Sequence, residues 1–165
     1  MTETMTQTRT LHVERSTSTA HRLSHYEGVC GNIHGHNFKW EVEVEVSFDP
    51  DDEAAMPLDL KDVSDAIDQV DHACLLNKSD PIMADVGGLV SQPLVEDLFG
   101  DVVWFDQDPT CEIVAAWMAE QIYQLTTDVV DVDVFVYETD KYGVSHSYEG
   151  DGLEQFVTQA EGGQL

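Results

Sequence analysis

Residues 30–36 read CGNIHGH and could bind a metal ion beside a reactive thiol. Residues two apart on a β-strand point to the same face, so His34 and His36 would present their imidazoles side by side. A third histidine, His21, lies upstream and could join them from a neighbouring strand. Three protein ligands with one open coordination position are typical of a catalytic zinc site rather than a structural one.

Cys30 lies four residues before His34, close enough to be presented beside such a metal. A thiol near zinc can have a lowered pKa, and the thiolate is the reactive form, so Cys30 is the candidate base or nucleophile. The alternative is a small buried residue, which is the role we expect for Cys74 and Cys111. The histidines also have an alternative, since a His-x-His pair alone can occupy surface or core positions without a metal.

The strands that must position these residues are predicted from hydrophobic alternation. The strongest candidate covers residues 38–48, where valine and phenylalanine alternate with glutamate and serine. Alternating valines predict another strand at 129–138, and residues 142–148 complete a hairpin with it. Residues 9–18 form a weaker candidate strand.

Two helices are predicted between these strands. Residues 59–70 place Leu60, Val63 and Ile67 on one face. The second helix begins with Asp108 as its cap and Pro109 at its first position, and it continues to about residue 125. The order strand, strand, helix, helix, strand, strand favours an α+β fold, in which an antiparallel sheet carries its helices on one face.

Four segments, in order, resemble the family of 6-pyruvoyl-tetrahydropterin and 6-carboxytetrahydropterin synthases. They are Ala-His-Arg with CxxxHGH at 20–39, DHxxLLN at 71–77, PTxE at 109–117 and VYET at 136–139. The resemblance runs from about Arg9 to about Gly150. It implies the tunnelling fold, a four-stranded antiparallel sheet with two helices on one face. In that family the sheets of several subunits close into a barrel, normally in a homohexamer.

The resemblance also assigns roles to residues. It implies that His21, His34 and His36 bind Zn2+, and that Cys30 works with Asp71 and His72 in proton transfer. An adjacent carboxylate can orient and charge an imidazole, which suits the Asp71–His72 pair. The alternative for His72 is a helix-end histidine that interacts with the helix dipole.

Three further residues match positions that contact a pterin ring in the family. Glu138 ends a strand, and one carboxylate can accept hydrogen bonds from two neighbouring donors on the ring edge. Thr110 and Glu112 match two other pterin-contacting positions. The alternatives are an exposed strand-end acid for Glu138 and helix N-terminal stabilisation for Thr110 and Glu112.

The spacing CxxxHGH resembles the carboxy branch of the family. This branch converts 7,8-dihydroneopterin triphosphate to 6-carboxy-5,6,7,8-tetrahydropterin, releases acetaldehyde and triphosphate, and supplies 7-deazaguanine synthesis for archaeosine or queuosine. One alternative is 6-pyruvoyl-tetrahydropterin synthase activity, which only eliminates triphosphate. A non-catalytic zinc- or pterin-binding subunit is another, although Cys30, Asp71 and His72 argue against it.

The chain has 165 residues, with 33 acidic residues against 7 basic ones and a formal net charge of -26. This excess argues against binding a polyanion such as nucleic acid through a general basic surface. The acids are spread along the chain, which favours a protein that works in concentrated salt, where charges are strongly screened. The alternative is an ordinary acidic protein.

Composition and pattern also predict location and domain limits. No signal-peptide pattern or long apolar run occurs, so we expect a cytoplasmic protein with three free thiols and no membrane contact. We expect disordered tails at 1–8 and 158–165 around a single domain at 9–157. Residues 78–108 form a long insertion, which could cover the pocket or extend a subunit contact.

Overall fold

The computed structural model describes residues 7–51, 53, 56–82 and 92–150, and its centre is a six-stranded sheet of order β4-β3-β1-β2-β5-β6. The strands are β1 (Gln7–His21), β2 (His34–Phe48), β3 (Cys74–Asn77), β4 (Val102–Phe105), β5 (Val129–Thr139) and β6 (Tyr142–Glu149). The helices are α1 (Leu60–Asp68), α3 (Gln92–Phe99) and α4 (Cys111–Tyr123), with one 3-10 turn, η1 (Val29–Gly31).

Strands β1 and β2 form a long antiparallel hairpin that pairs from Gln7↔Phe48 to His21↔His34. β1 is longer than the predicted strand because polar residues occupy inward positions and hide the alternation. Thr17, for example, is buried and accepts a hydrogen bond of 2.9 Å from the indole Nε1 of Trp40. This extra length puts His21 at the last position of β1, directly opposite His34.

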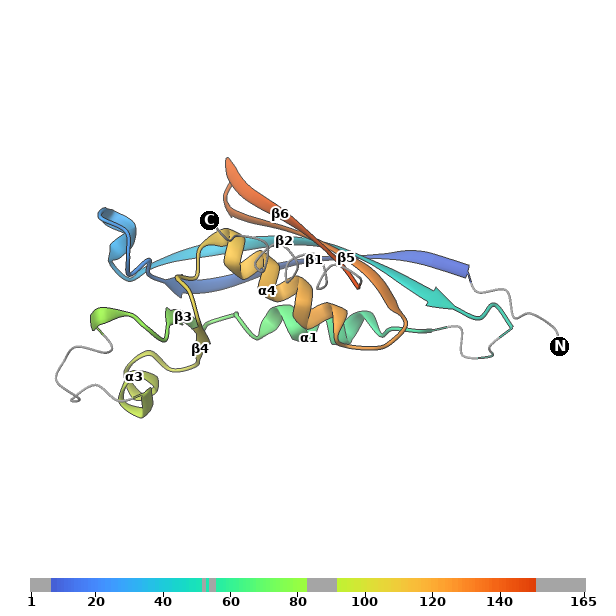
Figure 1. The fold of residues 1–165 in the computed structure, drawn as a ribbon, viewed down its shortest axis with the longest axis horizontal. Helices are drawn as coiled ribbons and strands as arrows, with labels where there is room; N and C mark the ends of the chain where they lie inside the picture. Colours follow the sequence, from blue (N-terminus) through green and yellow to red (C-terminus); the bar gives the residue numbers. More distant parts are fainter. Residues whose placement is uncertain (1–6, 52, 54–55, 83–91, 151–165) are drawn as a thin grey trace, which may run out of the picture.

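Helices α1 and α4 lie side by side on one face of this sheet (Figure 1). We call this the covered face; it takes the even-numbered residues of β2 and, from Val132 onward, those of β5. Those residues include Val42, Val44 and Val46 on β2 and Val132, Val134 and Val136 on β5, all fully buried. The opposite face, here called the open face, carries the odd-numbered residues of β2 and, from Asp131 onward, those of β5. No helix among the described residues packs on it.

The prediction of a four-stranded antiparallel sheet was wrong in strand number and direction. Strands β3 and β4 extend the sheet beyond β1, and β3 pairs parallel with both β1 and β4. Each has only four residues, and β3 is buried at every position, so neither shows alternation. The additional helix, α3, lies with β4 inside the predicted insertion at 78–108.

The two predicted helices are present, but the second begins later than expected. Asp59 caps α1, where its side chain accepts a hydrogen bond from the backbone of Lys61, 2.9 Å away. The cap of α4 is Thr110, not Asp108, and its hydroxyl accepts from the backbone N–H of Ile113. Asp108 therefore lies outside the helix, where its carboxylate binds other segments.

The predicted domain limits are only partly described. The hairpin begins at Gln7, inside the predicted tail at 1–8, whereas residues 1–6 and the predicted tail at 158–165 lie outside the described residues. Within the described part, no helix is long and apolar enough to cross a membrane.

Candidate metal and substrate site

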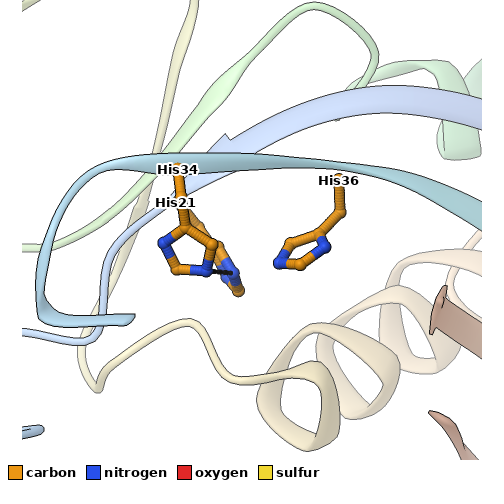
Figure 2. A group of neighbouring side chains, drawn as sticks. All are labelled: His21, His34 and His36. Carbon is orange, nitrogen blue, oxygen red and sulfur yellow. Dashed lines mark hydrogen bonds between the residues drawn. The ribbon is translucent and has the colours of Figure 1, made fainter. Parts of the chain in front are cut away.

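The three histidines predicted to bind zinc lie together at one end of the covered face. Figure 2 shows His34 and His36 projecting from β2 toward the segment that enters α4, with His21 beside them. The Nε2 atoms of His21 and His34 are 3.1 Å apart, and one ring nitrogen from each histidine lies within 4.8 Å of the others. The predicted ligand set is therefore one cluster in space, built from two paired strands.

Backbone carbonyls orient two of these rings. His21 Nδ1 lies 2.8 Å from the carbonyl oxygen of Pro109, and His34 Nδ1 lies 2.8 Å from that of Asn32. Each Nδ1 therefore donates to its carbonyl, so in the neutral imidazole Nε2 carries the lone pair that faces the cluster. Such carbonyl contacts are how metal-binding histidines are commonly fixed.

The chemistry of the cluster fits a metal ion. The Nε2 atom of His36 is buried and makes no hydrogen bond of good geometry to the described residues, although Oε1 of Glu138 lies 3.3 Å away. A buried polar atom of this kind needs a partner. Burial lowers the pKa of His21, and the neighbouring His34 and His36 lower it further, against the opposing effects of Pro109 and Glu138. Neutral imidazoles with a free Nε2 are the form that binds zinc, so the residues fit the predicted metal.

Glu138 on β5 lies directly beside the histidines. Its Oε1 atom is 3.4 Å from Nε2 of His21 and 3.3 Å from Nε2 of His36. Its side chain is still 29% exposed, so the carboxylate can reach a ligand as well as the cluster.

A cavity of about 440 Å3 opens next to Glu138, within the size range of small-molecule sites. Its wall includes His21 together with all three residues predicted to contact the ring, Thr110, Glu112 and Glu138. Leu23, Tyr142 and Val144 add apolar surface. Thr110 also has the alternative role predicted for it, stabilisation of a helix N-terminus, because it caps α4 while it lines the cavity.

Cys30 lies in η1 between β1 and β2 and is partly exposed, but it is not part of the histidine cluster. The other two cysteines are buried, as expected. Burial raises the pKa of Cys74 to about 11, and burial with the charges of Glu138 and Glu112 raises that of Cys111 to about 12. Both of these thiols therefore stay protonated near neutral pH.

Asp71 and His72 form the predicted pair, with Asp71 Oδ2 3.0 Å from His72 Nδ1. The backbone N–H of Ser18 donates to Asp71 and lowers its pKa; burial opposes this effect, and His72 adds to it. His72 has a φ of 57°, a left-handed conformation that non-glycine residues seldom adopt and that is enriched at functional sites.

His72 lines a second cavity of about 420 Å3, whose wall also includes Ser18, Asn37 and His36 of the histidine cluster. Ser18 and Asn37 alternate with the inward residues Thr19 and His36, so their side chains point to the open face. Within one chain, neither Asp71 nor His72 lines the cavity that Glu138 shares with Thr110 and Glu112.

A family model identifies the family of this chain: residues 10–149 match the model described as 6-pyruvoyl tetrahydropterin synthase. The chain belongs to this family. Curated relatives include a probable 6-carboxy-5,6,7,8-tetrahydropterin synthase of Halobacterium salinarum, 32% identical over 142 residues, which cover 82% of this chain and 87% of the relative. A Pyrococcus horikoshii relative, whose name assigns the same activity provisionally, is 31% identical over 102 residues, 59% of this chain and 62% of its own.

The family's fold is also found in solved structures similar to this chain. A 6-pyruvoyltetrahydropterin synthase of Plasmodium vivax superposes with a TM-score of 0.58 at 16% identity, covering 87% of this chain and 99% of that one. At this identity the likeness shows the fold alone.

Sequence reasoning missed three parts of the family site. Pro109 was noted as a helix start, yet its backbone carbonyl orients His21, and no side-chain pattern reveals a carbonyl. Leu23 and Tyr142 line the cavity because of loop and hairpin geometry. Their only signal was position, since each lies within a few residues of a predicted site residue.

Proposed function

We propose that this protein is a zinc-dependent 6-carboxytetrahydropterin synthase that converts 7,8-dihydroneopterin triphosphate to 6-carboxy-5,6,7,8-tetrahydropterin, acetaldehyde and triphosphate. The observation that carries the proposal is the convergence of His21 and Glu138 on one cavity beside His34 and His36. Family membership supports a pterin synthase, and the names of both curated relatives favour the carboxy product.

Glu138 anchors the pterin ring in this proposal. Its carboxylate lies on the cavity wall and can accept two hydrogen bonds from the amino and ring N–H groups. Leu23 and Val144 supply apolar surface for the flat ring. Glu112 lies on the same wall at the first turn of α4, where helix stabilisation accounts for part of its role.

His21, His34 and His36 would hold the zinc ion. When bound there, zinc would act as a Lewis acid that acidifies the hydroxyl groups of the substrate side chain. Because Glu138 would bind the pterin ring and the zinc held by the histidines would bind the substrate side chain, the substrate would have one orientation along the cavity.

Cys30, Asp71 and His72 would move protons between the ring and the side chain. Because neither Asp71 nor His72 lines the cavity next to Glu138 in the single chain, we propose that a second copy of the chain brings its own Asp71–His72 pair to the thiol. His72 is available for this, since its side chain is 81% exposed. The predicted homohexamer is therefore part of the proposal.

Product analysis tests this function. Zinc-loaded protein is incubated with 7,8-dihydroneopterin triphosphate, and acetaldehyde and the pterin product are measured. We expect turnover to be abolished in Cys30→Ala while zinc stays bound, and to persist in Cys74→Ala, the matched control for loss of a thiol. Near-normal turnover in Cys30→Ala would reject its role and the mechanism built on it.

The second candidate is 6-pyruvoyl-tetrahydropterin synthase activity, favoured by the name of the family model. It uses the same site but releases no acetaldehyde, so the same assay distinguishes the two. The use of the product in archaeosine or queuosine synthesis and the cytoplasmic location stay predictions.

A further inference from the structure

Asp108 connects three segments that surround the site. Its carboxylate accepts hydrogen bonds from Ser24 Oγ, from the backbone N–H of His25 at 2.8 Å and from Asn77 Nδ2 at 2.9 Å. Its side chain is only 14% exposed. Ser24 and His25 belong to the connection between β1 and β2, here called the β1–β2 loop (residues 22–33), and Asn77 ends β3.

The residue after Asp108 touches the histidine cluster. Pro109 follows in the chain, and its carbonyl oxygen accepts the hydrogen bond from His21 Nδ1. A shift of Asp108 would move this carbonyl and with it the ring of His21. Thr110, one residue further, caps α4 and lines the cavity.

The β1–β2 loop, which Asp108 contacts through Ser24 and His25, also contains Cys30. Next to Ser24, the backbone N–H of Leu23 donates to the carbonyl of Cys30 at 2.9 Å. Further backbone hydrogen bonds close the β1–β2 loop on itself as far as Asn32, whose carbonyl orients His34. The loop is thus one hydrogen-bonded unit, and Asp108 binds it near its start.

A carboxylate suits this position, because Ser24 Oγ, the backbone N–H of His25 and Asn77 Nδ2 all donate to it. The ring Nδ1 of His25 lies 3.3 Å from it as well. Burial raises the pKa of Asp108, but the hydrogen bonds from Ser24, Asn77 and His25 outweigh this effect and lower the pKa overall. The side chain is therefore charged and accepts only. An asparagine would turn an NH2 group toward one of these donors and leave buried groups unpaired.

We propose that Asp108 is a positioning residue of this site: it fixes the β1–β2 loop against the segment that enters α4, and so sets His21, His34 and Cys30 relative to the cavity. This inference rests on the proposed metal site. It predicts that loss of the Asp108 contacts weakens zinc binding and changes the accessibility of Cys30, even in protein that remains folded.

The test compares Asp108→Asn with Asp106→Asn, a matched amide change in the same segment whose exposed carboxylate contacts only Lys78 among the described residues. Zinc affinity is measured by competition with a chelator. We expect Asp108→Asn to bind zinc roughly tenfold more weakly, as when outer contacts of a metal site are removed. Asp106→Asn should keep the wild-type affinity.

A second readout does not depend on metal. The alkylation rate of Cys30 is measured on zinc-free protein, where Cys74 and Cys111 react slowly because burial raises their pKa. We expect a faster rate in Asp108→Asn and an unchanged rate in Asp106→Asn. Wild-type protein that binds no zinc would contradict the proposed function, and the alkylation rates would then decide the role of Asp108 alone.

Ser24→Ala provides a milder test in case Asp108→Asn does not fold. It removes one of the donors and should change zinc affinity and alkylation in the same direction by a smaller amount. The inference is overturned if Asp108→Asn melts at a lower temperature but keeps wild-type zinc affinity and Cys30 reactivity. It is equally overturned if Ser24→Ala changes neither property when Asp108→Asn cannot be prepared.

Discussion

Strand β2 presents different chemistry on its two faces. On the covered face, Val42 and Val44 are fully buried in the core, and the same row of alternate residues continues through Phe38 to His36 and His34. On the open face, acids of β2 stand directly opposite acids of β5: Glu43 opposite Asp133, and Glu45 opposite Asp131. The candidate site is thus the end of the core, whereas the acidic surface is its reverse side.

This difference shows what each face contributes. Burial on the covered face lowers the pKa of His21 and so favours its neutral, metal-binding form. Like charges placed directly opposite on the open face destabilise a sheet when they are poorly screened. We therefore expect the covered face to determine function and the open face to determine the response to salt.

The largest expected effect is on zinc binding, and it distinguishes a histidine on the covered face from one on the open face. His36→Ala removes one of three ligands and should abolish stoichiometric zinc binding, and His34→Ala should do the same. His12 lies on the open face of β1 opposite Glu43, so His12→Ala is the matched control and should retain about one zinc per chain. Elemental analysis of the purified proteins measures their zinc content. Undiminished zinc in both His34→Ala and His36→Ala would show that the proposed ligand set is wrong.

The two-residue spacing was enough to predict that His34 and His36 share one face of a strand. The position of Glu138 beside the histidines could not be predicted, because it depends on the register of β5 against β2. Strands β3 and β4 were missed because four residues give too short a pattern. Asp108 was read as a helix cap from its position before Pro109, whereas its partners come from segments distant in sequence.

A smaller effect distinguishes the two acids on the cavity wall of the covered face. Glu138→Gln places a donor against a donor of the ring, and an unpaired buried group costs about 1–3 kcal/mol, so pterin binding should weaken at least about tenfold. Zinc content should stay unchanged. Glu112→Gln is the matched control and should have the smaller effect. Calorimetric titration with a pterin measures both, and equal affinity of wild type and Glu138→Gln would show that Glu138 is not the ring anchor.

The smallest effect belongs to the open face. Burial raises the pKa of Asp131, and Asp133, Glu149 and Glu45 raise it further, outweighing a hydrogen bond from the backbone of Val132. A carboxyl whose pKa is raised on folding destabilises the folded state when it is charged, and this penalty disappears as the pH falls through the raised pKa. Asp131→Asn should therefore stabilise the protein by about 0.2–1 kcal/mol at neutral pH and low salt.

Urea unfolding measures this difference between variant and wild type. The gain should shrink toward acidic pH and in molar salt, where the wild type itself should become more stable. Asp106→Asn, which loses a contact with Lys78 instead of a repulsion, should show no gain. A wild-type stability that is flat or falls with added salt would contradict the salt adaptation inferred from the charge of -26.

The central claim is that the end of the covered face is a zinc-dependent pterin site. Its most direct test is acetaldehyde release from 7,8-dihydroneopterin triphosphate by protein stripped of metal with a chelator, before and after zinc is added back. We predict that release falls to background in the stripped protein, and that added zinc restores it in the wild type but not in His36→Ala. Acetaldehyde release that continues at the original rate in stripped protein would contradict the claim.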